Sequence, residues 1–395
     1  MKSDLLILGV AAAGLLAFLS PFVRRQRFWR AMVTPLASII GSGFLVLGPI
    51  LNDNLGYLAP AAMALLALIA YGFGGAIRFN IARSGSAPGH IEPWIEAAAG
   101  WMLAVSYVIS VAYYLNLLGS FAVRLTPFND PLYAKSVTTS VFLTILVVGW
   151  TRGFKALEGL EKYSVSLNLA AILGLLVGLA LFCGENVVAT GPVLSAPHVG
   201  PWAAITLFFG LIVTVQGFET SRYLGDQYDA DLRIRSMRGA QIVSTAIYLL
   251  YVTLLVLSFA PDDRPPDETA IIGLTHLVSP ILPIVLTAAA LAAQFSASVA
   301  DTTGAGGLVV ERTKGRVGNR LAYAGLVAAG IGLTWTAHIF EIIAYASRAF
   351  ALYYAMQAAV AALSARRTGQ GRRAMGFALL SVLGLAIAVL GRPVE

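Results

Sequence analysis

Charged residues are scarce in this chain. Only 12% of its 395 residues are Asp, Glu, Lys or Arg, whereas 58% are hydrophobic. A soluble domain carries about 25% charged residues, so this chain has too few to cover a surface that faces water. A lipid bilayer must therefore surround most of the chain, and a protein that is soluble throughout is excluded.

Cysteine and metal-ligand patterns are also lacking. Cys183 is the single cysteine, which excludes an internal disulfide and any cysteine-based zinc or iron–sulfur site. The four histidines show no ligand spacing, and no Walker motif is present, which argues against ATP-driven transport by this chain alone. We expect no cofactor other than Na⁺ or H⁺ as a coupling ion.

Long apolar runs are what the chain has instead. A bilayer core about 30 Å thick needs about 20 apolar residues per helix, and continuous runs exclude a transmembrane barrel, whose strands would alternate. The sequence predicts an all-α integral membrane protein with about twelve membrane-spanning helices. The segments are 4–20, 31–52, 56–77, 97–122, 136–151, 163–183, 203–221, 239–260, 278–300, 321–337, 339–364 and 374–391.

The basic residues predict how these helices are oriented. With the N-terminus outside, 21 of the 27 basic residues fall in cytoplasmic loops, five fall outside and Arg348 alone lies within a segment. The positive charge is thus assigned to membrane orientation and not to nucleic acid. Segment 4–20 is expected to be an uncleaved anchor, because Ser20-Pro21-Phe22 is a poor cleavage site and Arg24–Arg30 follows it. Arginine makes up 22 of the basic residues, which favours a GC-rich bacterial genome and hence a bacterial inner membrane.

Two segments carry glycines at positions where a helix could open. Gly41 and Gly43 lie halfway along 31–52 and flank Ser42, and Gly210 and Gly217 lie within 203–221. Glycines lower the cost of opening a helix, and opened backbone is tolerated in a membrane only beside a cavity or ligand. Close helix packing is the alternative for Gly-Ser-Gly alone. However, each segment opens a set of five helices, and breaks at matching positions of inverted halves are typical of a transporter site.

Four stretches, taken in order, resemble the amino acid–polyamine–organocation (APC) superfamily. They are Ile39-Ile40-Gly41-Ser42-Gly43-Phe44 with Gly56, Gly153-Phe154-Lys155, Gly217-Phe218-Glu219 with the loop Asp226–Arg238, and Arg312-Thr313-Lys314-Gly315. The resemblance covers about 31–364 and implies a LeuT-like fold of five plus five inverted helices, with one extra helix at each end. The implied units are an extra helix and basic loop (1–30), two five-helix repeats (31–183 and 184–364) and a final helix (365–395).

The resemblance also implies where a substrate binds. In APC amino-acid transporters the segment matching Gly41, Ser42 and Gly43 binds the substrate carboxylate, and freed N–H groups at a half-helix end favour an anion there. Tyr107 is too deep for an interfacial belt and lies on a helix that borders the site in this fold. The second break adds Gln216, Gly217 and Phe218. Val213 stands where many relatives have an aromatic residue, so amino-acid transport is a family expectation.

Ionisable residues in the predicted helices are candidates for coupling or gating. In APC relatives the carboxylate equivalent to Glu219 tethers helix 6 and can take part in proton coupling. The alternative is an interfacial carboxylate held by Arg222 or by an arginine of a loop. Arg348 lies deep in its segment and needs a partner. Glu341, seven residues away on the same face, is the preferred partner, and a substrate carboxylate or Asp301 is the alternative.

A cluster of oxygen-bearing side chains ends segment 278–300. Ser298, Asp301 and Thr302 are the candidate sodium ligands, with Ser296 and Thr303 beside them, although hydroxyls in membrane helices usually bond to their own backbone. Some proton-coupled APC members place a lysine mid-helix 5, where this chain has Asn168 and Ala171. Sodium is therefore favoured over the proton.

These patterns together predict the class of protein. We expect a secondary active transporter that imports a small polar solute, an amino acid or a related carboxylate-bearing compound, by ion-coupled alternating access. A transporter of a nucleobase or inorganic cation on the same fold is the alternative. A membrane enzyme is disfavoured, because the one acidic cluster, Asp262–Glu268, has the composition of a solvated turn. The expected partners are the solute and the lipid bilayer.

Overall fold

The computed structural model describes residues 2–41, 43–83, 91–151, 160–261 and 267–394, and within these ranges the chain is helical with no β-strand. Ser42, the motif Gly153-Phe154-Lys155 and most of the turn Asp262–Glu268 lie outside the described residues.

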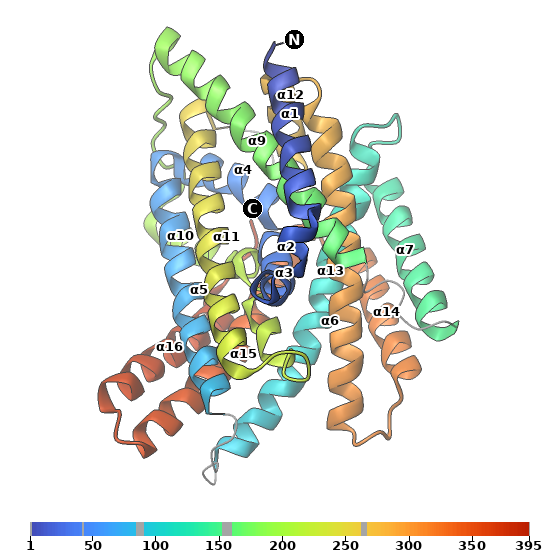
Figure 1. Cartoon of the computed structure of the whole chain (residues 1–395), viewed down its shortest axis with the longest axis vertical. Coiled ribbons are helices and arrows are strands. Elements are labelled where there is room, and N and C mark those ends of the chain that lie inside the picture. Colours follow the sequence, from blue (N-terminus) through green and yellow to red (C-terminus); the bar gives the residue numbers. More distant parts are fainter. Residues whose placement is uncertain (1, 42, 84–90, 152–159, 262–266, 395) are drawn as a thin grey trace.

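The helices form one bundle with their long axes mostly along its length (Figure 1). The α-helices are α1 (Lys2–Leu19), α2 (Pro21–Arg25), α3 (Arg27–Ile40), α4 (Gly43–Leu55), α5 (Ala59–Ala82), α6 (Glu92–Arg124), α7 (Pro131–Thr151), α9 (Leu160–Thr190), α10 (Pro201–Gly210), α11 (Ala230–Ser258), α12 (Ala270–Val278), α13 (Leu282–Arg312), α14 (Asn319–Thr336), α15 (Ile339–Arg367) and α16 (Gly371–Leu390).

Eight helical spans among the described residues are long and apolar enough to cross a membrane. Four of the twelve predicted segments are not separate spans by this measure. Segments 31–52 and 203–221 are interrupted. Segments 321–337 and 339–364 form the continuous helices α14 and α15, which are not among the eight spans. The eight spans are Ser3–Arg25, Gly43–Ala82, Glu92–Arg124, Pro131–Thr151, Tyr163–Ala189, Ala230–Ser258, Leu282–Arg312 and Gly371–Leu390.

The two segments with central glycines are both interrupted, as the sequence predicted. In the first, α3 ends at Ile40 and α4 begins at Gly43. In the second, α10 ends at Gly210, and two short 3₁₀-helices follow, η2 (Ile212–Val215) and η3 (Phe218–Tyr223). Gly217 between them has a φ of 116°, a left-handed conformation that side chains other than glycine's rarely adopt.

The two interruptions lie against each other. Gly43 packs directly on Thr214, and Gly217 packs on Ser38, in each case without room for a side chain. Each break frees backbone groups that lipid cannot satisfy, so protein donors must do so. Tyr248 of α11 serves both breaks, because its hydroxyl lies 3.0 Å from the Ile39 carbonyl oxygen and 2.6 Å from that of Thr214.

A second polar side chain satisfies the end of α10. The Ser347 hydroxyl, on α15, donates to the Gly210 carbonyl (2.6 Å) and accepts the Val213 N–H (3.1 Å). Asn168 of α9 also donates to the Ile40 carbonyl at the end of α3 (3.4 Å). The breaks are therefore held open by side chains from three neighbouring helices.

The first and last helices lie at the edge of the bundle. Figure 1 shows α1 beside α9, and α16 beside α15 at the lower left. Gly174 and Gly178 let α1 approach α9 closely, because Ile7 would contact a side chain at either position.

Candidate functional site

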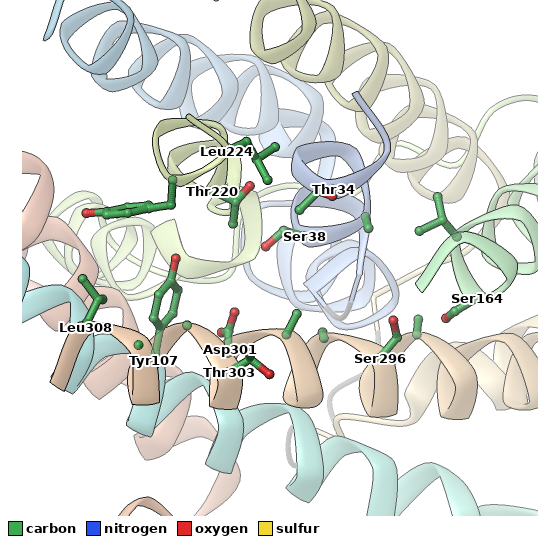
Figure 2. A pocket seen from close by; sticks show the side chains of 18 of the residues that line it. Thr34, Ser38, Tyr107, Ser164, Thr220, Leu224, Ser296, Asp301, Thr303 and Leu308 are labelled. Carbon is green, nitrogen blue, oxygen red and sulfur yellow. The ribbon is translucent and has the colours of Figure 1, made fainter. Parts of the chain in front are cut away.

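A cavity of about 500 Å³ lies between α3, α9, α13 and η3. Figure 2 shows α13 running along one wall, with Thr34 and Ser38 facing it from α3, Ser164 from α9 and Thr220 from η3. Eight of the twelve polar residues in its described lining carry a hydroxyl. The lining residues are Thr34, Ala37, Ser38, Tyr107, Ser164, Val165, Asn168, Thr220, Tyr223, Leu224, Asp226, Ala293, Ser296, Ala297, Ala300, Asp301, Thr303, Gly304, Gly307, Leu308 and Glu311.

Asp301 is the buried charged residue of this cavity. Its carboxylate accepts a hydrogen bond from the Ser110 hydroxyl of α6. No described Lys, Arg or His forms an ion pair with it. The other two acidic lining residues, Asp226 and Glu311, are exposed.

The cavity carries acidic charge without basic charge. Asp226, Asp301 and Glu311 line it, and no Lys, Arg or His is among its described lining residues. A buried carboxylate such as that of Asp301 favours a cationic ligand group, and the exposed Asp226 and Glu311 add charge of the same sign at the rim. The described lining is therefore suited to an ammonium group or a metal cation and offers no basic side chain to an anion.

Tyr107 is held at the cavity wall by its neighbours. Its ring packs against Gly304, where a Cβ would lie 3.1 Å from the ring. On another side it meets the Phe350 ring edge to face, with the centroids 6.0 Å apart. These contacts fix the ring beside Asp301, as Figure 2 shows.

The predicted sodium ligands do not all face this cavity. The Ser298 hydroxyl donates to the Phe295 carbonyl (2.8 Å) and the Thr302 hydroxyl to the Ser298 carbonyl (2.6 Å). Both therefore bond to their own helix, as membrane hydroxyls commonly do. Asp301 faces the cavity instead with Ser296 and Thr303. The residues in the described ranges include no cluster of three His, Cys, Asp or Glu side chains suited to a metal ion.

Among the described residues, Gly41, Gly43, Gln216, Gly217 and Phe218, which were predicted at the two breaks, are not part of the cavity lining. Gly41 and Gly43 flank the first break, and Ser42 between them is outside the described residues. At the second break Gln216 donates to the Tyr114 hydroxyl (3.0 Å), and its own buried Oε1 accepts no hydrogen bond. Phe218 stacks on Tyr354, with the ring centroids 5.0 Å apart. Of the described residues predicted to bind substrate, Tyr107 lines the cavity.

Glu219 is fully buried beside the second break. Its Oε2 accepts hydrogen bonds from the Gly217 N–H (3.0 Å) and the Tyr354 hydroxyl (2.7 Å), while its Oε1 has no partner. The alternative in which Arg222 holds this carboxylate is wrong. Arg222 pairs with Glu96 of α6 at 2.5 Å and also donates to Gln357 of α15.

The expected ion pair between Arg348 and Glu341 does not form, although both residues belong to a described helix. Arg348 is exposed and donates to the Ala388 carbonyl of α16 (2.8 Å). Glu341 accepts the His338 N–H (2.7 Å) and caps the start of α15. Arg348 and Glu341 therefore each bond to a backbone group and not to each other. Arg348 is also absent from the described lining of the cavity beside Asp301.

Sequence reasoning missed Ser110 and Glu96. Ser110 lies three residues after Tyr107 on α6, so the two side chains share a face, and this spacing could have indicated it. Glu96 lies near the start of α6, and its partner Arg222 is 126 residues away in the chain. Local sequence carries no signal for such a pairing.

Comparison with known proteins identifies the family of this chain. Residues 21–391 match the family of APC superfamily transporters. The chain is also 40% identical, over 394 residues, to a protein of Aquifex aeolicus (strain VF5) that is described only as uncharacterized, and the match covers 96% of this chain and 95% of that protein. The chain is thus a multi-pass membrane protein of the transporter class. It belongs to the APC superfamily.

Proposed function

We propose that this protein is an ion-coupled secondary active transporter that imports a small polar solute by alternating access. The proposed architecture has twelve spans in a LeuT-like arrangement: an extra helix (1–30), two inverted five-helix repeats (31–183 and 184–364) and a final helix (365–395). Two interrupted segments that pack on each other, with a cavity alongside, support this arrangement.

The buried carboxylate of Asp301 is the observation from which we infer the chemistry of the solute. A carboxylate buried in a membrane helix without a basic partner is costly, and a cationic group of the solute would offset that cost. An amino acid or related compound would place its amino group at Asp301. Its carboxylate would then face the opened backbone at Gly41 and Gly43, where freed N–H groups favour an anion.

A second candidate is a cationic solute that has no carboxylate, such as an amine or an inorganic cation. The specific observation in its favour is the charge of the cavity, which has three acidic and no basic residues among its described lining. Both proposals place a cationic group at Asp301. Only the amino-acid proposal also places a carboxylate at the break near Gly41.

The cavity would open to the cytoplasm in a bacterial inner membrane. Asp226 and Glu311 lie at its exposed rim, in regions whose neighbouring arginines the positive-inside rule assigns to the cytoplasm. The described conformation would then be the inward-facing state, with the N-terminus of the chain outside.

Thermal unfolding with added compounds tests this proposal. Purified protein would be heated with amino acids, amines, organic acids and nucleobases, each with and without sodium. A ligand at 100 times its Kd stabilises the folded state by about 2.7 kcal/mol, which gives a visible shift. We expect a shift from compounds that carry an amino group, and its absence in Asp301→Asn.

The matched control is Glu311→Gln, an identical change of carboxylate to amide at the exposed rim of the same cavity. It should keep the shift. Equal shifts in the wild type and Asp301→Asn would contradict the proposal, as would stabilisation by organic acids that lack an amino group.

A further inference from the structure

A second cavity, of about 410 Å³, lies where α1, α2, α3 and α9 meet. The short helix α2 turns the chain between α1 and α3 in front of the bundle (Figure 1). The cavity combines three arginines with apolar and aromatic side chains. Its lining residues are Phe18, Leu19, Pro21, Arg24, Arg25, Trp29, Arg30, Val33 and Ser166.

The charge of this second cavity is opposite to that of the cavity lined by Asp301, which we call the solute cavity. Arg24, Arg25 and Arg30 line it, and no acidic residue is among its described lining. None of these three guanidinium groups forms an ion pair with a described carboxylate. Although the three arginines are exposed, guanidinium groups gathered around one hollow suit a phosphate, because each presents a fork of N–H donors that fits phosphate oxygens.

Aromatic contacts fix the positions of side chains that line this second cavity. The Arg24 guanidinium lies 5.2 Å from the centre of the Tyr163 ring and donates to the Tyr163 hydroxyl at 3.5 Å. Trp29 stacks on Phe18, with the centroids 5.6 Å apart and the rings 2° from parallel. One basic side chain and one apolar wall are thus positioned before any ligand binds.

The cavity lies where an apolar membrane helix meets a basic loop. The span Ser3–Arg25 is apolar along α1 and ends in the arginines of α2. Phe22, beside the cavity, is 77% exposed, and exposed aromatic residues of this kind are typical of a membrane interface. A matching ligand carries a phosphate group and an apolar tail that can lie along α1.

We propose that this cavity binds the phosphate group of an anionic phospholipid, with the arginines on the headgroup and the stacked rings beside the upper acyl chain. Basic pockets between membrane helices on the cytoplasmic side are suited to such headgroups. The site is separate from the solute cavity, although α3 and α9 form walls of both.

The test is the thermal stability of the full-length protein in detergent with added phosphatidylglycerol or phosphatidylcholine of the same acyl chains. We expect phosphatidylglycerol to stabilise the wild type and phosphatidylcholine to have little effect. The triple variant Arg24→Gln/Arg25→Gln/Arg30→Gln should bind phosphatidylglycerol at least about tenfold more weakly.

The matched control is Arg366→Gln/Arg372→Gln/Arg373→Gln, which removes the same charge from the adjoining ends of α15 and α16. It should keep the wild-type response. An equal loss in this control would overturn the proposal, because the effect would then come from general surface charge. Equal stabilisation by phosphatidylcholine, or by inorganic phosphate at the same phosphate concentration, would also overturn it, the latter by making the site one for free phosphate.

A second measurement does not depend on the triple variant folding. Brominated phosphatidylglycerol should quench tryptophan fluorescence of the wild type more than brominated phosphatidylcholine does, and Trp29→Phe should remove the difference. No difference between the two lipids in the wild type would overturn the proposal. Neither measurement involves the solute, so a failure here is distinguishable from a failure of the proposed transport function.

Discussion

Tyr248 shows at the scale of one residue how an opened helix is made stable. Its hydroxyl lies within hydrogen-bond distance of two carbonyls, those of Ile39 and Thr214, that the breaks leave without helical partners. Tyr248→Phe removes the donor and leaves buried acceptors unsatisfied, which costs about 1–3 kcal/mol. We expect a lower Tm in thermal unfolding of the purified protein.

Tyr251→Phe is the matched control, because Tyr251 is on the same helix, is fully buried and has only a weak hydrogen bond, of 3.5 Å, to the Leu45 carbonyl. Its Tm should fall less. Equal loss in the two variants would mean that the Tyr248 hydroxyl at the breaks stabilises the protein no more than the weakly bonded Tyr251 hydroxyl does.

Glu219 provides a second prediction at this scale. Its buried carboxylate has hydroxyl and N–H donors and a free Oε1, and no described basic group pairs with it. A group in this setting can take up a proton without breaking an ion pair. In Glu219→Gln, which keeps the size but not the titration, we expect solute uptake to lose its dependence on pH. An unchanged profile of uptake against pH would exclude Glu219 from coupling.

The sequence singled out Asp301 and Tyr107, and both line the cavity that we propose as the solute site. It could not separate Asp301 from Ser298 and Thr302, because hydropathy does not tell which face of a uniformly apolar helix meets the cavity. It paired Arg348 with Glu341 on spacing alone. The structure gives each of them a backbone partner. The Ala388 carbonyl, 40 residues from Arg348, is beyond any local spacing rule, whereas the His338 N–H lies three residues before Glu341, as in a capping box.

At the scale of the element, glycine spacing predicted where two helices open. Gly41, Gly43 and Gly217 fall at the breaks that the structure shows. How the freed backbone is satisfied could not be predicted, since the donors come from helices far away in the chain. Ser347 is 134 residues from Val213, and Tyr248 is 209 residues from Ile39.

Ser347→Ala tests this support of the second break. The change removes one donor and one acceptor, so both the Gly210 carbonyl and the Val213 N–H lose their partner. We expect faster backbone hydrogen exchange in the region 210–217 than in the wild type. Ser381→Ala removes a serine that donates to the Ala355 carbonyl between α16 and α15, and it should leave exchange in that region unchanged. Slow exchange in Ser347→Ala would show that the break is held by other contacts.

At the scale of the whole molecule, a polar network joins four elements near η3. Arg222 of η3 contacts Glu96 of α6 and Gln357 of α15, and Gln357 accepts a hydrogen bond from Asn80 of α5 (3.0 Å). These contacts tie η3, one wall of the cavity that we propose as the solute site, to the rest of the bundle. Apolar runs in the sequence predicted the helices of this bundle, but such cross-links depend on the fold itself.

Glu96→Gln tests this network. The variant leaves the half-buried Arg222 without its carboxylate, and the loss of a charged hydrogen bond of this kind costs about 1–3 kcal/mol. We expect a clear fall in Tm. Asp231→Asn, which breaks the exposed Arg235–Asp231 pair of α11, should cost less than about 0.5 kcal/mol. If both variants lost the same stability, the network would contribute no more than a surface ion pair.

The most direct test of transport through this cavity is counterflow. Proteoliposomes loaded with an unlabelled compound that stabilises the protein should accumulate the labelled compound from outside. We predict counterflow by the wild type and by Glu311→Gln, and its loss in Asp301→Asn. Full counterflow by Asp301→Asn, or none by the wild type with any stabilising compound, would contradict transport of a solute bound at Asp301.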